Sequence, residues 1–196
     1  VLADNGHLDE AYRLLLREEY PSWLYQVKQG ATTVWEHWDG MKPDGSMWSP
    51  DMNSFNHYAY GAVGEWMYRT IGGLDLNASD IAAGRFVLAP RPPGLSRSVE
   101  TGNGGRHAAS RGPTSAELTY YSGYGPLRVA WRLEQPGGSA TEERLGDAAT
   151  SGTRSLHLEV SVPPNSTVEL RSPTAGPGEG PVTELRPGRH RSQFEI

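Results

Sequence analysis

Residues 29–66 read QGATTVWEHWDGMKPDGSMWSPDMNSFNHYAYGAVGEW, and this stretch is the most informative part of the chain. It holds four Trp, two His, three Asp and two Glu. Aromatic rings beside carboxylates suit a site for sugars. The flat C–H faces of a sugar ring stack on indoles, and cleavage of a glycosidic bond requires carboxyl groups around that bond. The same composition also suits a Trp-rich helical core with solvated acids.

Two motifs within this stretch resemble a known enzyme family. GATTVWEHWDG (Gly30 to Gly40) followed by MNSFNHYAYGAVGEW (Met52 to Trp66) closely resembles the bacterial α-L-rhamnosidases of glycoside hydrolase family 78. Both motifs are long and correctly spaced, so the match is more specific than a short pattern. The resemblance continues weakly through FVLAPRPPG (86–94) and VSVPPNSTVEL (160–170). It covers most of the chain, but only the C-terminal part of such an enzyme.

The resemblance implies an α+β fold, with the closing helices of an (α/α)6 barrel followed by an antiparallel β-sandwich. We place the barrel part at residues 1–75 and the sandwich at residues 76–196, because the composition changes after Gly72-Gly73. Twelve of the fifteen prolines lie beyond residue 89. Short alternating runs separated by turn residues then predict strands. These runs are 85–89, 115–121, 127–134, 155–162, 167–171 and 188–196.

Apolar spacing predicts three helices in the first part of the chain. The first covers residues 5–20, with Asn5 as its cap and Pro21 blocking its continuation. Its stripe at i, i+3, i+4 and i+7 consists of Leu8, Ala11, Tyr12 and Leu15. A short helix is predicted at 22–29, and residues 30–50 are predicted to form an ordered loop.

A longer helix is predicted from Ser54 to Ile71, capped by Asn53 or Ser54. Its expected buried stripe is Phe55, Ala59, Val63, Trp66, Met67 and Thr70. His57 shares another face with two glycines, which are costly in a helix by about 1 kcal/mol each relative to alanine. Close approach of a ligand or of another backbone would compensate for that cost, and crowding in the core is the alternative explanation.

Composition excludes several classes of partner. The net charge of −5 gives no reason to expect a nucleic acid. The absence of cysteine excludes disulfides and thiolate metal sites, and no apolar run approaches the ~20 residues of a membrane span. The acidic spacing at residues 39–45 is not that of an EF-hand, so no metal is predicted. The resemblance implies catalysis without a cofactor.

Glu36 is the candidate general base. Hydrolysis with inversion requires a base that activates water and an acid that protonates the leaving oxygen, with their carboxyls about 6.5–9.5 Å apart. Glu36 lies between Trp35 and Trp38, and it matches the Trp-Glu motif that carries the base in the family. The alternative is a structural Glu paired with His37 or with a distant Arg.

Three further residues are candidates for substrate binding. His57 matches the motif histidine that contacts the sugar in the family, and its alternative is a satisfied structural residue. Trp35 and Trp38 are candidate stacking platforms, with burial in the core as the alternative. We expect the acids Asp39, Asp44 and Asp51 to shape the loop through turns and caps rather than to act chemically.

The resemblance places the general acid in an Asp/Glu-rich motif well upstream of the base, and nothing in residues 1–35 matches that motif. The first residues, VLADNGHLDEAYRLL, lack the features of a signal peptide, and we expect them to be the interior of a longer protein. The intact enzyme would release terminal α-L-rhamnose from glycosides, together with the upstream barrel region. The isolated chain is expected to be inactive.

Two other functions stay open at this point. The chain would be a non-catalytic carbohydrate-binding or accessory module if it bound rhamnose without turnover. It would belong to another (α/α)6 hydrolase if a different sugar were the substrate.

Overall fold

The computed structural model describes the whole chain except residues 52–53, 76, 96–111, 135–153 and 175–179. It divides into two compact units. The helical unit consists of residues 1–67 with 93–112, and the sheet unit consists of residues 68–92 with 113–196.

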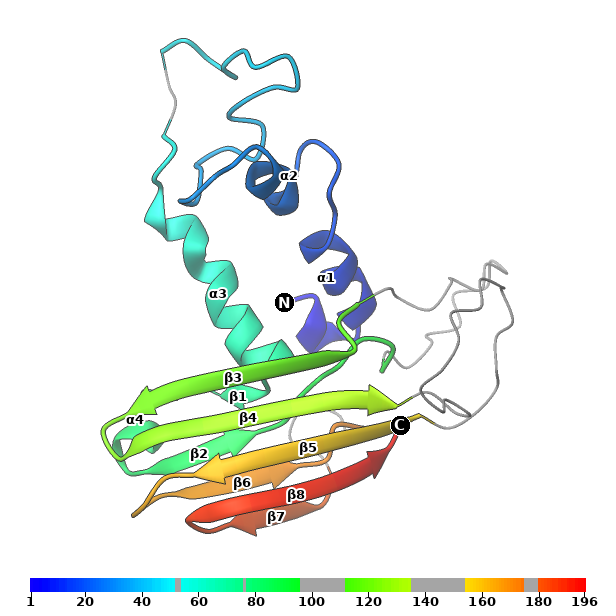
Figure 1. Cartoon of the computed structure of the whole chain (residues 1–196), viewed down its shortest axis with the longest axis vertical. Helices are drawn as coiled ribbons and strands as arrows, with labels where there is room; N and C mark the ends of the chain where they lie inside the picture. Colours follow the sequence, from blue (N-terminus) through cyan, green and yellow to red (C-terminus); the bar gives the residue numbers. More distant parts are fainter. Residues whose placement is uncertain (52–53, 76, 96–111, 135–153, 175–179) are drawn as a thin grey trace. The chain divides into compact units, whose positions relative to one another are not determined.

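The helical unit begins with three short helices, and after a long loop the chain forms helical turns that run without a break from Tyr58 (Figure 1). In chain order the helices are η1 (Ala3–Asn5), α1 (Leu8–Leu15), α2 (Trp23–Lys28), η2 (Tyr58–Ala62), α3 (Val63–Trp66) and η3 (Met67–Ile71). The boundary between the two units falls within η3, a π-helical turn, after its first residue.

Helix α1 confirms the predicted apolar stripe, because Leu8, Ala11, Tyr12 and Leu15 are all buried. Its predicted ends were wrong. Asn5 closes the separate 3-10 turn η1, and Gly6 follows it in a left-handed conformation, so the cap position of α1 is His7. After Leu15 the chain continues with exposed residues, of which Arg17, Glu18 and Glu19 are charged, so a further turn would bury little apolar surface.

The predicted 54–71 helix begins only at Tyr58. Residues 54–57 are not helical, and Ser54 and His57 pair through their backbones with Glu36 and Val34 instead. The predicted buried stripe was partly wrong: Thr70 is buried, whereas Ala59 and Met67 are exposed. The alternative cap Asn53 lies outside the described residues.

The sheet unit contains two four-stranded sheets, ordered β1-β2-β6-β7 and β3-β4-β5-β8 (Figure 1). The strands are β1 (Leu74–Asp75), β2 (Arg85–Leu88), β3 (Ser115–Ser122), β4 (Gly125–Glu134), β5 (Ser155–Val162), β6 (Thr167–Arg171), β7 (Val182–Leu185) and β8 (Gly188–Glu195). The described pairings are antiparallel, apart from the parallel pair β2–β6. A short helix α4 (Ala78–Ala82) precedes β2.

All six predicted strands are confirmed, with ends within a few residues of the prediction. Sequence patterns missed β1, β7 and α4. Strand β1 has two residues, too few to show alternation. Strand β7 has only its last residue buried, so its sequence lacks the apolar face that marks a strand.

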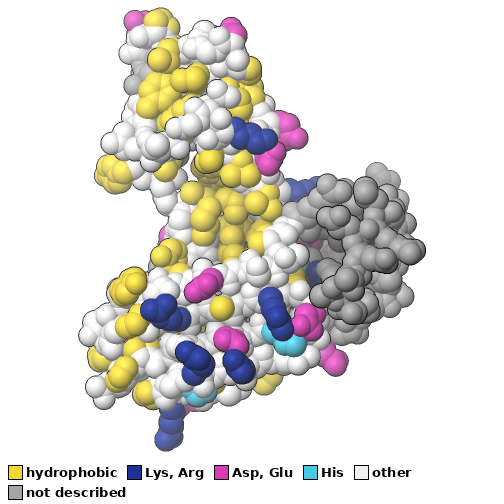
Figure 2. All heavy atoms as spheres, in the orientation of Figure 1, with side chains coloured by type: hydrophobic (Ala, Val, Ile, Leu, Met, Phe, Trp, Pro, Cys, Tyr) yellow, Lys and Arg dark blue, Asp and Glu magenta, His cyan; other side chains and the backbone are white. Residues whose placement is uncertain are grey.

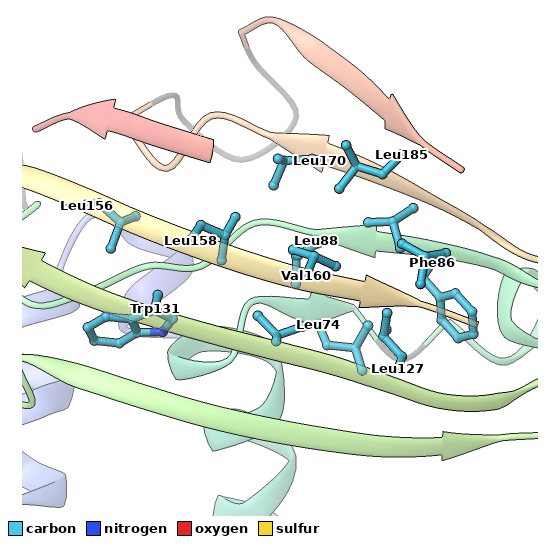
Figure 3. Packing of buried hydrophobic residues seen from close by; sticks show 13 residues of the cluster. Leu74, Phe86, Leu88, Leu127, Trp131, Leu156, Leu158, Val160, Leu170 and Leu185 are labelled. Carbon is cyan, nitrogen blue, oxygen red and sulfur yellow. The ribbon is translucent and has the colours of Figure 1, made fainter. Parts of the chain in front are cut away.

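Side chains from both sheets form one hydrophobic core (Figure 3). Its members are Leu74, Phe86, Leu88, Val168, Leu170 and Leu185 from one sheet, and Leu127, Val129, Trp131, Leu156, Leu158, Val160 and Val162 from the other. The Trp131 indole N–H donates to the carbonyl oxygen of Ile71 (2.7 Å), so the largest core ring also satisfies its polar atom.

The outer face of the β3-β4-β5-β8 sheet is polar and mixed in charge (Figure 2). Glu134 contacts both Arg132 (3.1 Å) and His157 (3.0 Å), and Arg191 pairs with Glu159 across β5 and β8 (2.7 Å). Because successive strand residues point to opposite faces, these polar residues alternate with the core residues along each strand.

We predict that Gly73→Ala destabilises the sheet unit. Gly73 has φ of +79°, and an added Cβ would lie 2.2 Å from the backbone nitrogen of Pro90. Backbone strain and backbone overlap together should lower the free energy of unfolding by at least about 2 kcal/mol. Chemical denaturation would measure the change.

The matched control for this prediction is Gly123→Ala in the β3–β4 turn, where an added Cβ meets no heavy atom within 4 Å. That variant should change stability by less than about 0.5 kcal/mol. Equal stability of the two variants would contradict the importance of the close contact at Gly73.

Candidate active site

Backbone hydrogen bonds pair the two motifs of the helical unit. The Glu36 N–H donates to the carbonyl oxygen of Ser54 (2.9 Å), and the His57 N–H donates to that of Val34 (2.7 Å). The Thr33 hydroxyl also donates to the carbonyl oxygen of Phe55. Residues that are twenty or so positions apart in the sequence are thereby held side by side.

This pairing places the side chains of Glu36 and His57 together. Oε2 of Glu36 and Nδ1 of His57 are 4.0 Å apart, and the side chains are 25% and 39% exposed, respectively. The imidazole also lies against the Tyr60 ring, with centroids 5.1 Å apart. A carboxylate and an imidazole that both reach solvent can contact the same small ligand.

The two candidate tryptophan platforms differ in exposure. Trp35 is 4% exposed and packs edge-on against Phe55, with ring centroids 4.9 Å apart. Trp38 is half-buried and packs edge-on against Trp23 at 4.8 Å. Stacking by either residue stays a prediction, but these exposures make Trp38 the stronger candidate, since the ring of Trp35 is already surrounded by protein.

A hairpin at residues 40–48 brings another tryptophan to the WEHWD motif. Its ends are joined by the Trp48 N–H, which donates to the carbonyl oxygen of Gly40 (3.0 Å), and by a bridge between Met41 and Met47. The Trp48 ring stacks on His37 with centroids 4.2 Å apart and 21° between the planes. Trp48 is 41% exposed, and sequence reasoning did not select it.

Asp44 shapes this hairpin, as the loop prediction required. Its Oδ1 accepts hydrogen bonds from the Ser46 hydroxyl (2.6 Å) and the Ser46 N–H (2.9 Å). Donation by Ser46, from its hydroxyl first and its N–H next, lowers the pKa of the Asp44 carboxyl. The pKa of the nearby Tyr20 is raised, first by loss of hydration and then by the carboxylate charge of Asp39.

Helix α2 fastens the loop through polar side chains, which sequence patterns also missed. Its buried positions are Ser22, Tyr25 and Gln26. The Ser22 hydroxyl caps the helix by accepting from the Tyr25 N–H (3.0 Å), and the Tyr25 hydroxyl donates to the carbonyl oxygen of Met41 (2.9 Å). The spacing of these residues gives one face, but their polarity conceals it from an apolar-period search.

Among the described side chains, no group of three His, Asp or Glu residues is arranged to hold a metal ion. The described helices are all too short or too polar to cross a membrane.

Comparison with known proteins gives consistent results for sequence and fold. Residues 1–71 match the model of the bacterial α-L-rhamnosidase six-hairpin glycosidase domain. An α-L-rhamnosidase of Streptomyces avermitilis is 40% identical over 182 residues, covering 90% of this chain and 14% of the relative. One from Formosa agariphila is 35% identical over 175 residues, covering 89% of this chain and 15% of that relative.

The crystal structure of the Streptomyces avermitilis α-L-rhamnosidase complexed with L-rhamnose aligns with a TM-score of 0.68 and 35% identity. The alignment covers 98% of this chain and 16% of that structure, and it confirms the predicted α+β fold class. Sequence and fold together relate the chain to the bacterial α-L-rhamnosidases, and residues 1–71 match the six-hairpin glycosidase domain of those enzymes.

Proposed function

We propose that this chain supplies the general base of an inverting glycoside hydrolase that releases terminal α-L-rhamnose from glycosides. The observation that carries the proposal is the pairing of the two motifs, which sets His57 Nδ1 4.0 Å from Glu36 Oε2 with both side chains open to solvent. The relatives in sequence and fold are α-L-rhamnosidases, which favours this substrate over other sugars.

In the proposed reaction, Glu36 accepts a proton from water as the water oxygen bonds to the anomeric carbon. The bond from that carbon to the leaving oxygen breaks, and a carboxylic acid on the opposite face of the sugar donates a proton to the leaving oxygen. His57 hydrogen-bonds a sugar hydroxyl, and the half-buried ring of Trp38 offers an apolar face to the sugar.

The general acid is proposed to lie in a region of the barrel upstream of residues 1–196. No segment of residues 1–35 matches the family's acid-bearing motif, and the chain spans 14–15% of the length of the curated relatives above. Residues 1–75 would be the closing helices of the (α/α)6 barrel, and residues 76–196 would be the β-sandwich.

We expect Glu36→Gln to abolish most of the turnover. The change keeps the shape of the side chain but removes the basic carboxylate, and general-base assistance is typically worth about 10²–10⁴-fold in rate. A suitable assay protein is a hybrid in which this chain replaces the matched segment of the Streptomyces avermitilis relative. Hydrolysis of an aryl α-L-rhamnoside by the purified hybrid would measure the effect.

The matched control is Glu65→Gln, which makes the same change at an exposed acid on α3. It should leave the rate close to that of the parent hybrid. Near-normal turnover by Glu36→Gln would remove this residue from the mechanism.

His57→Ala should weaken the use of substrate without unfolding the protein. Loss of one hydrogen bond to a sugar hydroxyl should cost about 1–3 kcal/mol of transition-state stabilisation. This cost should appear as a lower kcat/KM. Steady-state kinetics of the same hybrid and a thermal melt would separate binding from folding. The control is His7→Ala at the exposed start of α1. A lowered melting temperature with unchanged kinetics would support a purely structural His57.

The isolated chain should not hydrolyse rhamnosides at an enzymatic rate, because the base would lack its acid partner. It should also self-associate, since large apolar side chains are exposed on the helical unit (Figure 2). Those of residues 1–67 are Val1, Leu2, Leu14, Leu16, Val27, Met47, Trp48, Tyr58, Tyr60 and Met67.

An aryl α-L-rhamnoside assay and light scattering on purified residues 1–196 would check this prediction. A soluble monomer with ordinary turnover would overturn the assignment of the acid to another region. Binding of rhamnose without turnover, by both the chain and the hybrid, would favour a non-catalytic carbohydrate-binding module.

A further inference from the structure

We propose that Gln26 is a positioning residue that fixes the backbone of the proposed base Glu36. Gln26 is 3% exposed. Its side-chain Oε1 accepts from the Trp35 N–H (3.4 Å), and its Nε2 donates to the carbonyl oxygen of His37 (3.3 Å). One primary amide thus binds the residues immediately before and after Glu36. The inference rests on the proposed function of Glu36.

These two bonds define the orientation of the Gln26 amide. A backbone N–H requires an acceptor and a carbonyl oxygen requires a donor, so only one of the two amide orientations satisfies both Trp35 and His37. The amide therefore pairs with this short segment in the way that the backbone of a neighbouring strand would.

The opposite edge of the segment around Glu36 is also hydrogen-bonded. The Glu36 N–H points to the carbonyl oxygen of Ser54, and the carbonyl oxygen of Val34 accepts from His57. With Gln26 on one edge and residues 54–57 on the other, the segment from Val34 to His37 has partners on both sides. The Glu36 side chain starts from a backbone that cannot shift without breaking several of these bonds.

The backbone of Gln26 is itself well anchored. Its N–H donates to the carbonyl oxygen of the cap residue Ser22 (3.3 Å), and its own carbonyl oxygen accepts from the Ala31 N–H (3.0 Å). The neighbouring Tyr25 binds Met41 on the far side of the motif. Helix α2 is therefore a support from which the amide reaches the segment, rather than a helix that contributes mainly apolar surface.

The expected kinetic signature follows from this geometry. Gln26 is buried, and its amide binds backbone atoms, so its loss should not remove a substrate contact. A shift of the carboxylate by about 1 Å can cost on the order of 10² in rate. The change should therefore appear in kcat and leave KM nearly unchanged, whereas loss of a residue that only supports folding would lower the amount of active enzyme without changing its kcat.

The test uses the rhamnosidase hybrid with three variants: Gln26→Leu, Gln26→Glu and the control Gln29→Leu. Gln29 is exposed one turn further along the chain, so it receives the same change without the buried bonds. Active-site concentration is determined by titration, so that kcat refers to folded enzyme. Hydrogen exchange of the peptide containing Trp35 is measured in parallel.

We expect Gln26→Leu to lower kcat at least about tenfold, with KM within about twofold and faster exchange at the Trp35 amide. Gln26→Glu keeps the acceptor for Trp35 but loses the donor to His37, so its kcat should lie between those of the parent and the leucine variant. Gln29→Leu should behave like the parent hybrid.

Normal kcat in folded Gln26→Leu would overturn the proposal, and so would an equal loss in Gln29→Leu. Should the leucine variant not fold, normal kcat in Gln26→Glu would overturn it. The Glu36→Gln variant distinguishes failure of the Gln26 proposal from failure of the proposed function. An inactive Glu36→Gln beside a fully active Gln26→Leu refutes positioning alone, whereas an active Glu36→Gln refutes the role of the base.

Discussion

The candidate site depends on one constraint, the backbone pairing of Val34 and Glu36 with His57 and Ser54. Side chains from two separate motifs meet because these peptides share hydrogen bonds. The same pairing explains why the following helix begins only at Tyr58. In a helix begun at Ser54 the carbonyl oxygen of Ser54 would accept from the Tyr58 N–H, but here it accepts from the Glu36 N–H. Helix start and site geometry are thus two consequences of one interaction.

The loop that carries the site buries Trp35 and Gly40 without a regular sheet around it. Buried N–H and carbonyl groups must be paired, so other groups have to take the place of strand neighbours. Helix α2 provides them with Tyr25 and Gln26, and Asp44 performs the same task within the hairpin. Because the buried face of α2 carries these polar groups, the helix buries less apolar surface.

The sequence predicted the elements whose apolar residues recur at a regular spacing, and it did not reveal contacts that leave no regular spacing. The strands were found because apolar residues alternate along them, and the buried face of α1 was found from its helical period. The contacts of Gln26 involve one side chain and two peptides, which leave no pattern in the sequence. The choice of Glu36 and His57 came from resemblance to a family. Their proximity came only from the three-dimensional structure, because spacing cannot show which backbones pair.

The two units differ in what stabilises them. The sheet unit has one hydrophobic core that includes Trp131, and ion pairs such as Arg191–Glu159 lie on its outer face. Burial of apolar surface is therefore the main source of stability in this unit. The helical unit buries few large side chains apart from Tyr12, Tyr25 and Trp35, and its loop is held by directional bonds. Directional bonds fix atomic positions more narrowly than apolar contact does, because they weaken steeply with angle. A unit held in this way is suited to keeping Glu36 and His57 in register even where its apolar surface is incompletely covered.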